Sequence, residues 1–177
     1  MKNLSRRKFL GTAPVAAAAG LTLANTTMLS GFAAGLEAMP ALPAGVQLFT
    51  AQTIQDEIKV LEARPGSSNL VDGKTTPFVV LLQVEKATSA KEFEWHEGRD
   101  HIIQIIDGST LYEVGGTPTG AHVMGPGEWH ATGSVGSKSL ILGKGDILVI
   151  PRGTLHKRST EDSVTFYLIS PYGKMTA

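Results

Sequence analysis

Histidine and acidic side chains in two short segments are the residues whose types and spacing could do chemistry in this chain. Glu94 and His96 come shortly before His101 in the first segment, and His156 follows a turn-forming Pro-Arg-Gly in the second. Cysteine is absent from the sequence, which excludes a disulfide, a thiolate nucleophile, a zinc–thiolate site and an iron–sulfur cluster. Any metal that this protein binds must therefore be held by His, Asp or Glu.

Strand alternation predicts how the first segment presents its side chains. Residues two apart in a strand share a face, so Glu94 and His96 point the same way and Trp95 points away. A turn at Gly98 would bring His101 back beside them. A register slip of one residue would instead place Glu97 or Asp100 where Glu94 stands, because one step turns every side chain to the other face.

Almost everything after Pro77 has the pattern of short β-strands. Turn sequences such as Asp107-Gly108, Gly115-Gly116 and Pro151-Arg-Gly153 separate the apolar, β-branched runs, as in an antiparallel sandwich or barrel. The predicted strands are residues 78–85, 93–96, 101–106, 110–114, 139–142, 147–150 and 164–169. Seven such strands favour a jelly-roll-like barrel. Residues 115–137 are rich in Gly and Pro and are predicted to form a long loop that is either functional or covers the mouth of the barrel.

One helix is predicted ahead of the strands. Ile54, Ile58 and Leu61 recur at helical spacing over residues 52–63, and Thr53 with Asp56 is a candidate capping box. Pro65-Gly66 would end the helix. Residues 34–76 therefore form a leader and a helix, and residues 77–177 form the predicted barrel.

The first 33 residues have the layout of an export signal. A basic stretch precedes a short run of small apolar residues that is too short and too weakly apolar to span a membrane. Ser5-Arg-Arg-Lys-Phe-Leu10 resembles the twin-arginine signal, with Gly11 where a Lys is usual, which implies export of a folded protein to the periplasm. Cleavage is expected after Gly31-Phe-Ala33.

Composition sets limits on the partners. The chain has 177 residues, which is long enough for one domain. Its 16 basic residues are balanced by 16 acidic ones, which does not favour a basic nucleic-acid-binding surface. Removal of residues 1–33 takes away four basic residues and no acidic one, so the mature protein is mildly acidic. We expect no nucleic-acid partner and no membrane contact beyond the signal segment.

The segment from Gly145 to His156 resembles a conserved motif of the cupin superfamily. Gly145-Asp-Ile-Leu-Val-Ile-Pro151-Arg-Gly153-Thr-Leu-His156 matches the second cupin motif, G-x5-P-x-G-x2-H-x3-N, except that Thr160 replaces Asn. The first motif, G-x5-H-x-H-x(3,4)-E-x6-G, is matched in spacing when counted back from Gly108. His101 then stands at the Glu position, His96 at the second His and Glu94 at the first, while Thr88 replaces the opening Gly.

This resemblance, which covers about residues 78–170, implies a single all-β cupin jelly-roll barrel preceded by a short helix. Carried over position by position, it implies a metal held by Glu94, His96, His101 and His156. The family's three histidines and one carboxylate are all present, with Glu and His exchanged between two places. A divalent ion such as manganese, iron, nickel or zinc could accept this set, and manganese or iron is preferred to zinc because export of the folded protein avoids competition from tighter binders.

Several other polar and aromatic residues are weighed as site candidates. His130 is predicted either at the rim of the site or on a surface loop, and His122 on the surface. Glu128 would act as a general acid or base only if the fold placed it at the site. Arg99 and Arg152 are predicted as solvated turn residues, with an anionic substrate as the alternative. The aromatic residues of the strands are predicted to fill the barrel: Tyr112, Phe166 and Tyr167.

The resulting functional expectation is an exported, metal-dependent enzyme acting on a small molecule in the barrel cavity. Its reaction would be of the oxygenase, isomerase or lyase type, because cupins host all of these on one frame. The alternative is a small-ligand binding or sensing protein without catalysis, and a third possibility is a structural or adhesive secreted domain. The resemblance also favours a homodimer paired through sheet edges.

Overall fold

The computed structural model describes residues 42–90 and 92–174, and the predicted export signal lies outside them. One helix, α2 (Ala51–Ala63), precedes the strands, close to its predicted position. Its N-cap is Thr50, whose hydroxyl accepts a hydrogen bond from the backbone N–H of Thr53. The prediction that Thr53 begins the helix is wrong because Thr50 offers the same side chain one turn earlier.

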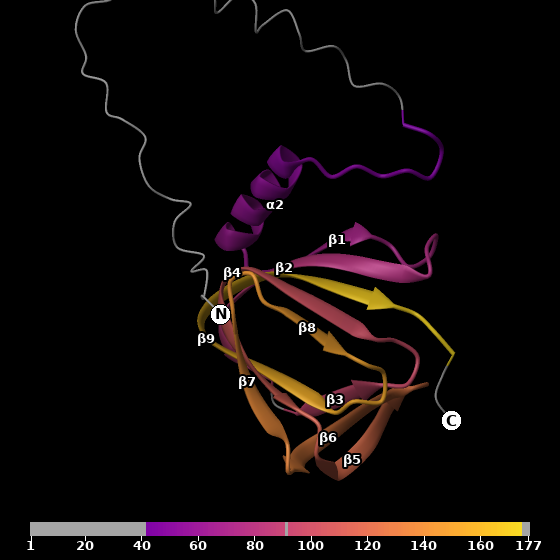
Figure 1. Cartoon of the computed structure of the whole chain (residues 1–177), viewed down its shortest axis with the longest axis vertical. Helices are drawn as coiled ribbons and strands as arrows, with labels where there is room; N and C mark the ends of the chain where they lie inside the picture. The colour runs from indigo at the N-terminus through magenta and orange to yellow at the C-terminus, as the bar shows by residue number, and fades with distance from the viewer. Residues whose placement is uncertain (1–41, 91, 175–177) are drawn as a thin grey trace, which may run out of the picture. The chain divides into compact units, whose positions relative to one another are not determined.

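In the described part of the chain, nine strands form one antiparallel sheet, which confirms the all-β prediction. They are β1 (Gly66–Val71), β2 (Phe78–Ser89), β3 (Phe93–His96), β4 (His101–Val114), β5 (Thr117–Gly125), β6 (Glu128–Val135), β7 (Lys138–Gly143), β8 (Ile147–Ile150) and β9 (His156–Pro171). The path of paired strands runs β1-β2-β9-β3-β6-β5, and β4 pairs with β7, β8 and β9. The long β9 therefore connects the two sides of the barrel (Figure 1).

The predicted loop over residues 115–137 is wrong, because strands β5 and β6 form an antiparallel hairpin there. Gly, Thr and Ser give these strands little of the apolar alternation that marks a strand in sequence. Figure 1 shows this hairpin and β3 at the end of the barrel away from α2. The hairpin carries Trp129, His122 and His130, so the sheet fixes the positions of these side chains.

Two strands predicted on either side of Asp107-Gly108 are one continuous strand, β4. The pairing of β4 with β9 shifts register around this point, so a β-bulge stands where a turn was expected. Gly108 has a φ of +75°, and a Cβ there would lie 2.1 Å from the carbonyl oxygen of Ser163 on β9. Only glycine therefore lets the two longest strands stay paired across the bulge.

Apolar clusters inside the barrel and beneath the helix stabilise the fold. The main core lies inside the barrel and includes Ile103, Tyr112 and Phe166, which confirms that Tyr112 and Phe166 fill the barrel. A second cluster joins Ile58 and Leu61 of α2 to β2, and the partly buried Tyr167 packs against it. In the residues that the structure describes, no helix is long and apolar enough to cross a membrane.

Candidate metal centre

Three buried histidines from three different segments meet inside the barrel. His96 ends β3, His101 begins β4 and His156 begins β9. One ring nitrogen of each lies within 4.8 Å of one from each of the other two, and the ring centroids are 4.7 to 5.5 Å apart. We call these three residues the inner trio. Three imidazoles at this spacing are a common donor set for a divalent metal.

Each ring of the inner trio is oriented by a hydrogen bond at its Nδ1. The Nδ1 of His96 donates to Glu128 Oε2 at 2.6 Å, and that of His156 donates to the carbonyl oxygen of Thr154 at 2.9 Å. The Nδ1 of His101 lies 2.8 Å from the hydroxyl of Ser170, which can accept from it. Glu128 and the carbonyl oxygen of Thr154 can only accept, so the Nδ1 atoms of His96 and His156 carry a proton and a neutral ring keeps its lone pair on Nε2. The Ser170 hydroxyl can accept or donate, so it orients the His101 ring and leaves both tautomers open.

Arg99 also binds Glu128, the hydrogen-bond partner of His96. Its Nη2 donates to the same Glu128 oxygen at 2.8 Å and lies 3.0 Å from His96 Nδ1. Arginine and the protonated Nδ1 are both donors, so the carboxylate oxygen is the acceptor for both. Glu128 is therefore fixed from two sides and fixes the His96 ring in turn.

Glu94 lies beside the inner trio rather than within it. Its Oε1 is 3.6 Å from His156 Nε2, which is beyond hydrogen-bond distance. Because the Nδ1 of His156 already donates, a neutral ring turns its Nε2 lone pair to Glu94 and repels the carboxylate, and the contact is attractive only when a proton or a cation lies between the two atoms. A cation between them would remove the repulsion, so Glu94 is suited to be a fourth ligand that moves inward when an ion binds.

The electrostatics of the site favour the neutral forms of His96 and His101 and the ionised form of Glu94. Burial, followed by the neighbouring His156 and His96, lowers the pKa of His101 to about 3. Burial and then Arg99 lower the pKa of His96, against the opposite effect of the nearby carboxylates. Interaction with His156 lowers the pKa of Glu94 to about 2. Neutral imidazole and ionised carboxylate are the forms that bind metals.

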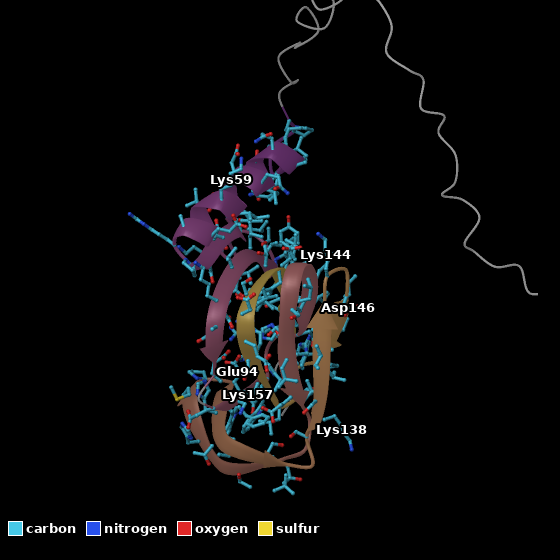
Figure 2. All side chains as sticks on the ribbon, turned by 90° about the vertical axis from the view of Figure 1, so that its left-hand side faces the viewer. Lys59, Glu94, Lys138, Lys144, Asp146 and Lys157 are labelled. Atoms are coloured by element: carbon cyan, nitrogen blue, oxygen red, sulfur yellow. The ribbon has the colours of Figure 1, made fainter. Side chains whose placement is uncertain are left out.

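A cavity of about 230 Å³ adjoins the inner trio. Its polar wall includes two members of the trio, three carboxylates and two cations: His101, His156, Glu85, Glu92, Glu94, Lys157 and Arg158. Tyr112 and Leu168 supply apolar and phenolic surface. Figure 2 shows Glu94 and Lys157 towards the end of the barrel away from α2. An ion held by the trio would thus border a space for a small molecule.

The fold is shared with solved structures of low sequence identity. An uncharacterised conserved protein with a double-stranded β-helix domain from Klebsiella pneumoniae matches at 14% identity over 77% of this chain and 93% of that chain, with a TM-score of 0.51. A cupin-2 domain containing protein from Shewanella frigidimarina matches at 13% identity over 69% and 99%, with a TM-score of 0.47. No family model and no curated protein matches the sequence.

The barrel has the cupin fold. Identities this low establish the fold and nothing about activity. Within this cupin barrel, the sequence motif and the structure agree on the place of His156, at the start of a strand after the Pro151 turn. Thr160, which replaces the motif's Asn, is buried and donates a hydrogen bond to Glu85 in the cavity wall.

The carboxylates offered by the alternative register are engaged elsewhere. Glu97 accepts a hydrogen bond from the indole of Trp129, and Asp100 is bound by the backbone and guanidinium of Arg152. The pairing of Glu94 with His156 and His130 across neighbouring strands settles the register in favour of Glu94. Arg99 and Arg152 are each paired with a carboxylate, so neither is a free anion-binding group.

The two histidines of the β5–β6 hairpin and the hydrogen-bond partners of the inner trio have the weakest signals in the sequence. His130 borders the site, 3.9 Å from Glu94, and His122 is partly exposed beside it. The sequence marks Glu128 as a possible acid or base and gives no signal for Ser170 or Glu92. Glu128 pairs with His96 across β3 and β6, Ser170 contacts His101 from near the end of β9, and Glu92 contacts His130 from just before β3. The tertiary structure is needed to bring each of them to its histidine.

Proposed function

We propose that this cupin is an exported metal-dependent enzyme whose ion is held by His96, His101, His156 and Glu94. The observation that carries the proposal is the meeting of three buried imidazoles, each with its Nδ1 engaged by another residue and one ring nitrogen within 4.8 Å of the other two rings. Three buried histidines whose only role was packing would not need to bring ring nitrogens this close together. Partners of this kind are typical of histidines that bind metals.

The residues around the centre have distinct parts in this proposal. A divalent ion bound there would polarise a substrate oxygen or activate water or dioxygen. Glu128 and the carbonyl oxygen of Thr154 hold the His96 and His156 rings, and Glu94 contributes the negative charge. The barrel wall restricts access of water to the trio, whose side chains are all less than a tenth exposed.

Manganese or iron is the proposed ion, with zinc next. Affinity for nitrogen and oxygen ligands rises along the first-row series to copper, so an open site filled after export would bind copper or zinc. A barrel that folds and binds its ion before export through the twin-arginine route escapes this competition. The metal identity and the export route therefore support each other as parts of one proposal.

The proposed substrate is a small polar molecule. The cavity volume of about 230 Å³ is slightly below the usual range of ligand sites. Its cations are paired with carboxylates, Arg158 with Glu85 and Lys157 with Glu113, so a strongly anionic substrate is disfavoured. An oxygenase, isomerase or lyase reaction fits such a pocket beside an ion.

The ion pairs of Arg158 and Lys157 also support a second candidate function, a small-ligand binding or sensing cupin without catalysis. Arg158 and Lys157 are engaged in ion pairs, which leaves fewer groups for proton transfer in the cavity wall. The two functions differ in whether the ion keeps an open coordination position. Iron(II)-loaded protein that binds nitric oxide, seen as an electron paramagnetic resonance signal, supports the enzyme, whereas a saturated ion with no such signal supports the binder.

Elemental analysis of natively exported protein tests the proposal. We expect manganese or iron bound to the inner trio of the wild type, and loss of that ion in His156→Ala and in His96→Ala. Glu161→Gln is the control, because Glu161 is exposed and follows His156 further along β9 without being part of the inner trio. Retention of the full metal content by both histidine variants would refute the ligand assignment.

Export and assembly are proposed alongside the function. Arg6→Lys combined with Arg7→Lys should leave the precursor in the cytoplasm, and normal periplasmic accumulation of that variant would refute the twin-arginine route. A homodimer is proposed through a sheet edge, where β1 or β5 ends the path of paired strands. Light scattering of the mature protein distinguishes the dimer from a monomer.

A further inference from the structure

A second group of ligand-type side chains lies next to the inner trio. Glu92, His122 and His130 each place one ligand atom within 4.8 Å of the other two, and we call them the outer cluster. The Oε2 atom of Glu92 is 3.1 Å from His130 Nδ1 and 3.6 Å from His122 Nε2. The two clusters together contain all five histidines of the chain.

Strand register aligns the two clusters in one row. His156 of β9 pairs with Glu94 of β3, Glu94 pairs with His130 of β6, and His130 pairs with His122 of β5. Directly paired residues point to the same face of a sheet, so these four side chains form a row across four neighbouring strands. Glu92 lies just before β3 and joins this row through its contact with His130.

Glu94 connects the two ends of this row. Its Oε1 is 3.6 Å from His156 Nε2, and its Oε2 is 3.9 Å from His130 Nε2. One carboxylate whose two oxygens face histidines of two clusters is arranged as a shared ligand. Glu92 and Glu94 both border the cavity next to the inner trio.

An ordinary surface ion pair explains this arrangement less well. A single hydrogen bond between Glu92 and His130 would not require His122 to face the same carboxylate oxygen. The Nδ1 of His122 donates to the carbonyl oxygen of Gly120 at 3.3 Å, which leaves its Nε2 lone pair towards Glu92. A lone pair and a carboxylate oxygen 3.6 Å apart repel each other unless a proton or a cation lies between them.

We propose that Glu92, His122 and His130 form a second divalent-metal site, linked to the inner trio through Glu94. Two imidazoles and one carboxylate suit a borderline ion of the zinc class. The side chains of His122 and His130 are 45% and 31% exposed, so this site exchanges its ion with the surrounding solution. The inference goes beyond the proposed function, because it concerns residues that the inner ion does not need.

Zinc stoichiometry tests the proposal. Mature full-length protein, stripped with a chelator and titrated with Zn²⁺ in equilibrium dialysis, is expected to bind two ions per chain. His122→Ala and Glu92→Gln should each bind one, and Glu161→Gln, the same substitution at an exposed carboxylate, should still bind two. His122 is exposed on the edge strand β5, so its removal leaves the core intact, which circular dichroism checks.

The variants separate the two sites. His156→Ala should lose the inner ion and keep the outer one, and His122→Ala should do the reverse. One zinc ion in the wild type that survives His122→Ala and Glu92→Gln would overturn the outer site while leaving the inner trio supported. One ion that survives His156→Ala and is lost in His122→Ala would overturn the trio and support the outer site.

Discussion

The inner trio and the outer cluster use the same side-chain types at different depths of one sheet. The residues of the trio are 4% to 7% exposed, whereas the side chains of His122 and His130 are 45% and 31% exposed. The trio lies on strands in the middle of the sheet, and the outer cluster lies towards its edge at β5. Burial therefore separates a preorganised site from an accessible one.

The partners of the rings differ in the same way. Glu128, itself bound by Arg99, orients His96, and the buried Ser170 orients His101. In the outer cluster, Glu92 both orients His130 and serves as a ligand candidate, so no separate residue fixes that ring. Because the inner trio is buried and its rings have dedicated partners, we expect the inner ion to bind tightly and exchange slowly. The outer ion should bind more weakly and exchange faster.

The largest expected effect is the loss of the inner ion. His156→Ala and His96→Ala each remove a buried ligand, and we expect metal affinity at the trio to fall by more than the factor of about 100 that partner residues alone can cost. The strands should survive, because the apolar core lies elsewhere in the barrel. Isothermal titration calorimetry with Mn²⁺ measures the loss of affinity. Unchanged affinity in both variants would contradict the assignment of the inner trio as the tight site.

The export route should affect only the inner site. Replacing residues 1–33 by a general secretory signal exports the chain unfolded, so we expect the inner manganese or iron to be replaced by zinc or copper. The outer site exchanges with the medium and should hold the same ion in both cases. Elemental analysis measures the change in the wild type and in His122→Ala, in which only the inner ion remains. Identical metal content from both routes would contradict the folded-export explanation.

Glu128→Gln should have an intermediate effect confined to the trio. The substitution keeps the size of the side chain and removes the charge that holds the Nδ1–H of His96. We expect inner-site affinity to fall about 10-fold to 100-fold, as for other partners of metal-binding histidines. Zinc binding at the outer cluster serves as the internal control, and a comparable loss there would show a general structural defect.

Ser170→Ala should have the smallest effect on the inner site. It leaves the Nδ1 of His101 buried without its hydrogen-bond partner, which costs about 1–3 kcal/mol. Because the ring remains in place through packing, we expect a fall in metal affinity of about 10-fold or less. Thermal unfolding of the metal-free protein measures the structural cost separately, and Ser170→Thr, which restores a hydroxyl, should recover part of the affinity.

The sequence by itself determined the type of fold and the ligands with a local signature. The predicted strands 93–96 and 147–150 coincide with β3 and β8, because each is a short β-branched or aromatic run between clear turn residues. The Pro151-x-Gly153 turn placed His156, and the absence of cysteine restricted the metal donors to His, Asp and Glu. These are local features, which a sequence records directly.

Tertiary structure alone decided which distant residues meet. Strands β5 and β6 are mostly exposed or half-buried and contain few large apolar residues, so their pairing comes from backbone hydrogen bonds that leave no periodic pattern. The bulge at Gly108 resembled a turn because the sequence does not show the contact with β9 that requires glycine there. The contact of His96 with Glu128, and the row from His156 to His122, arise from strand register, which depends on the whole sheet.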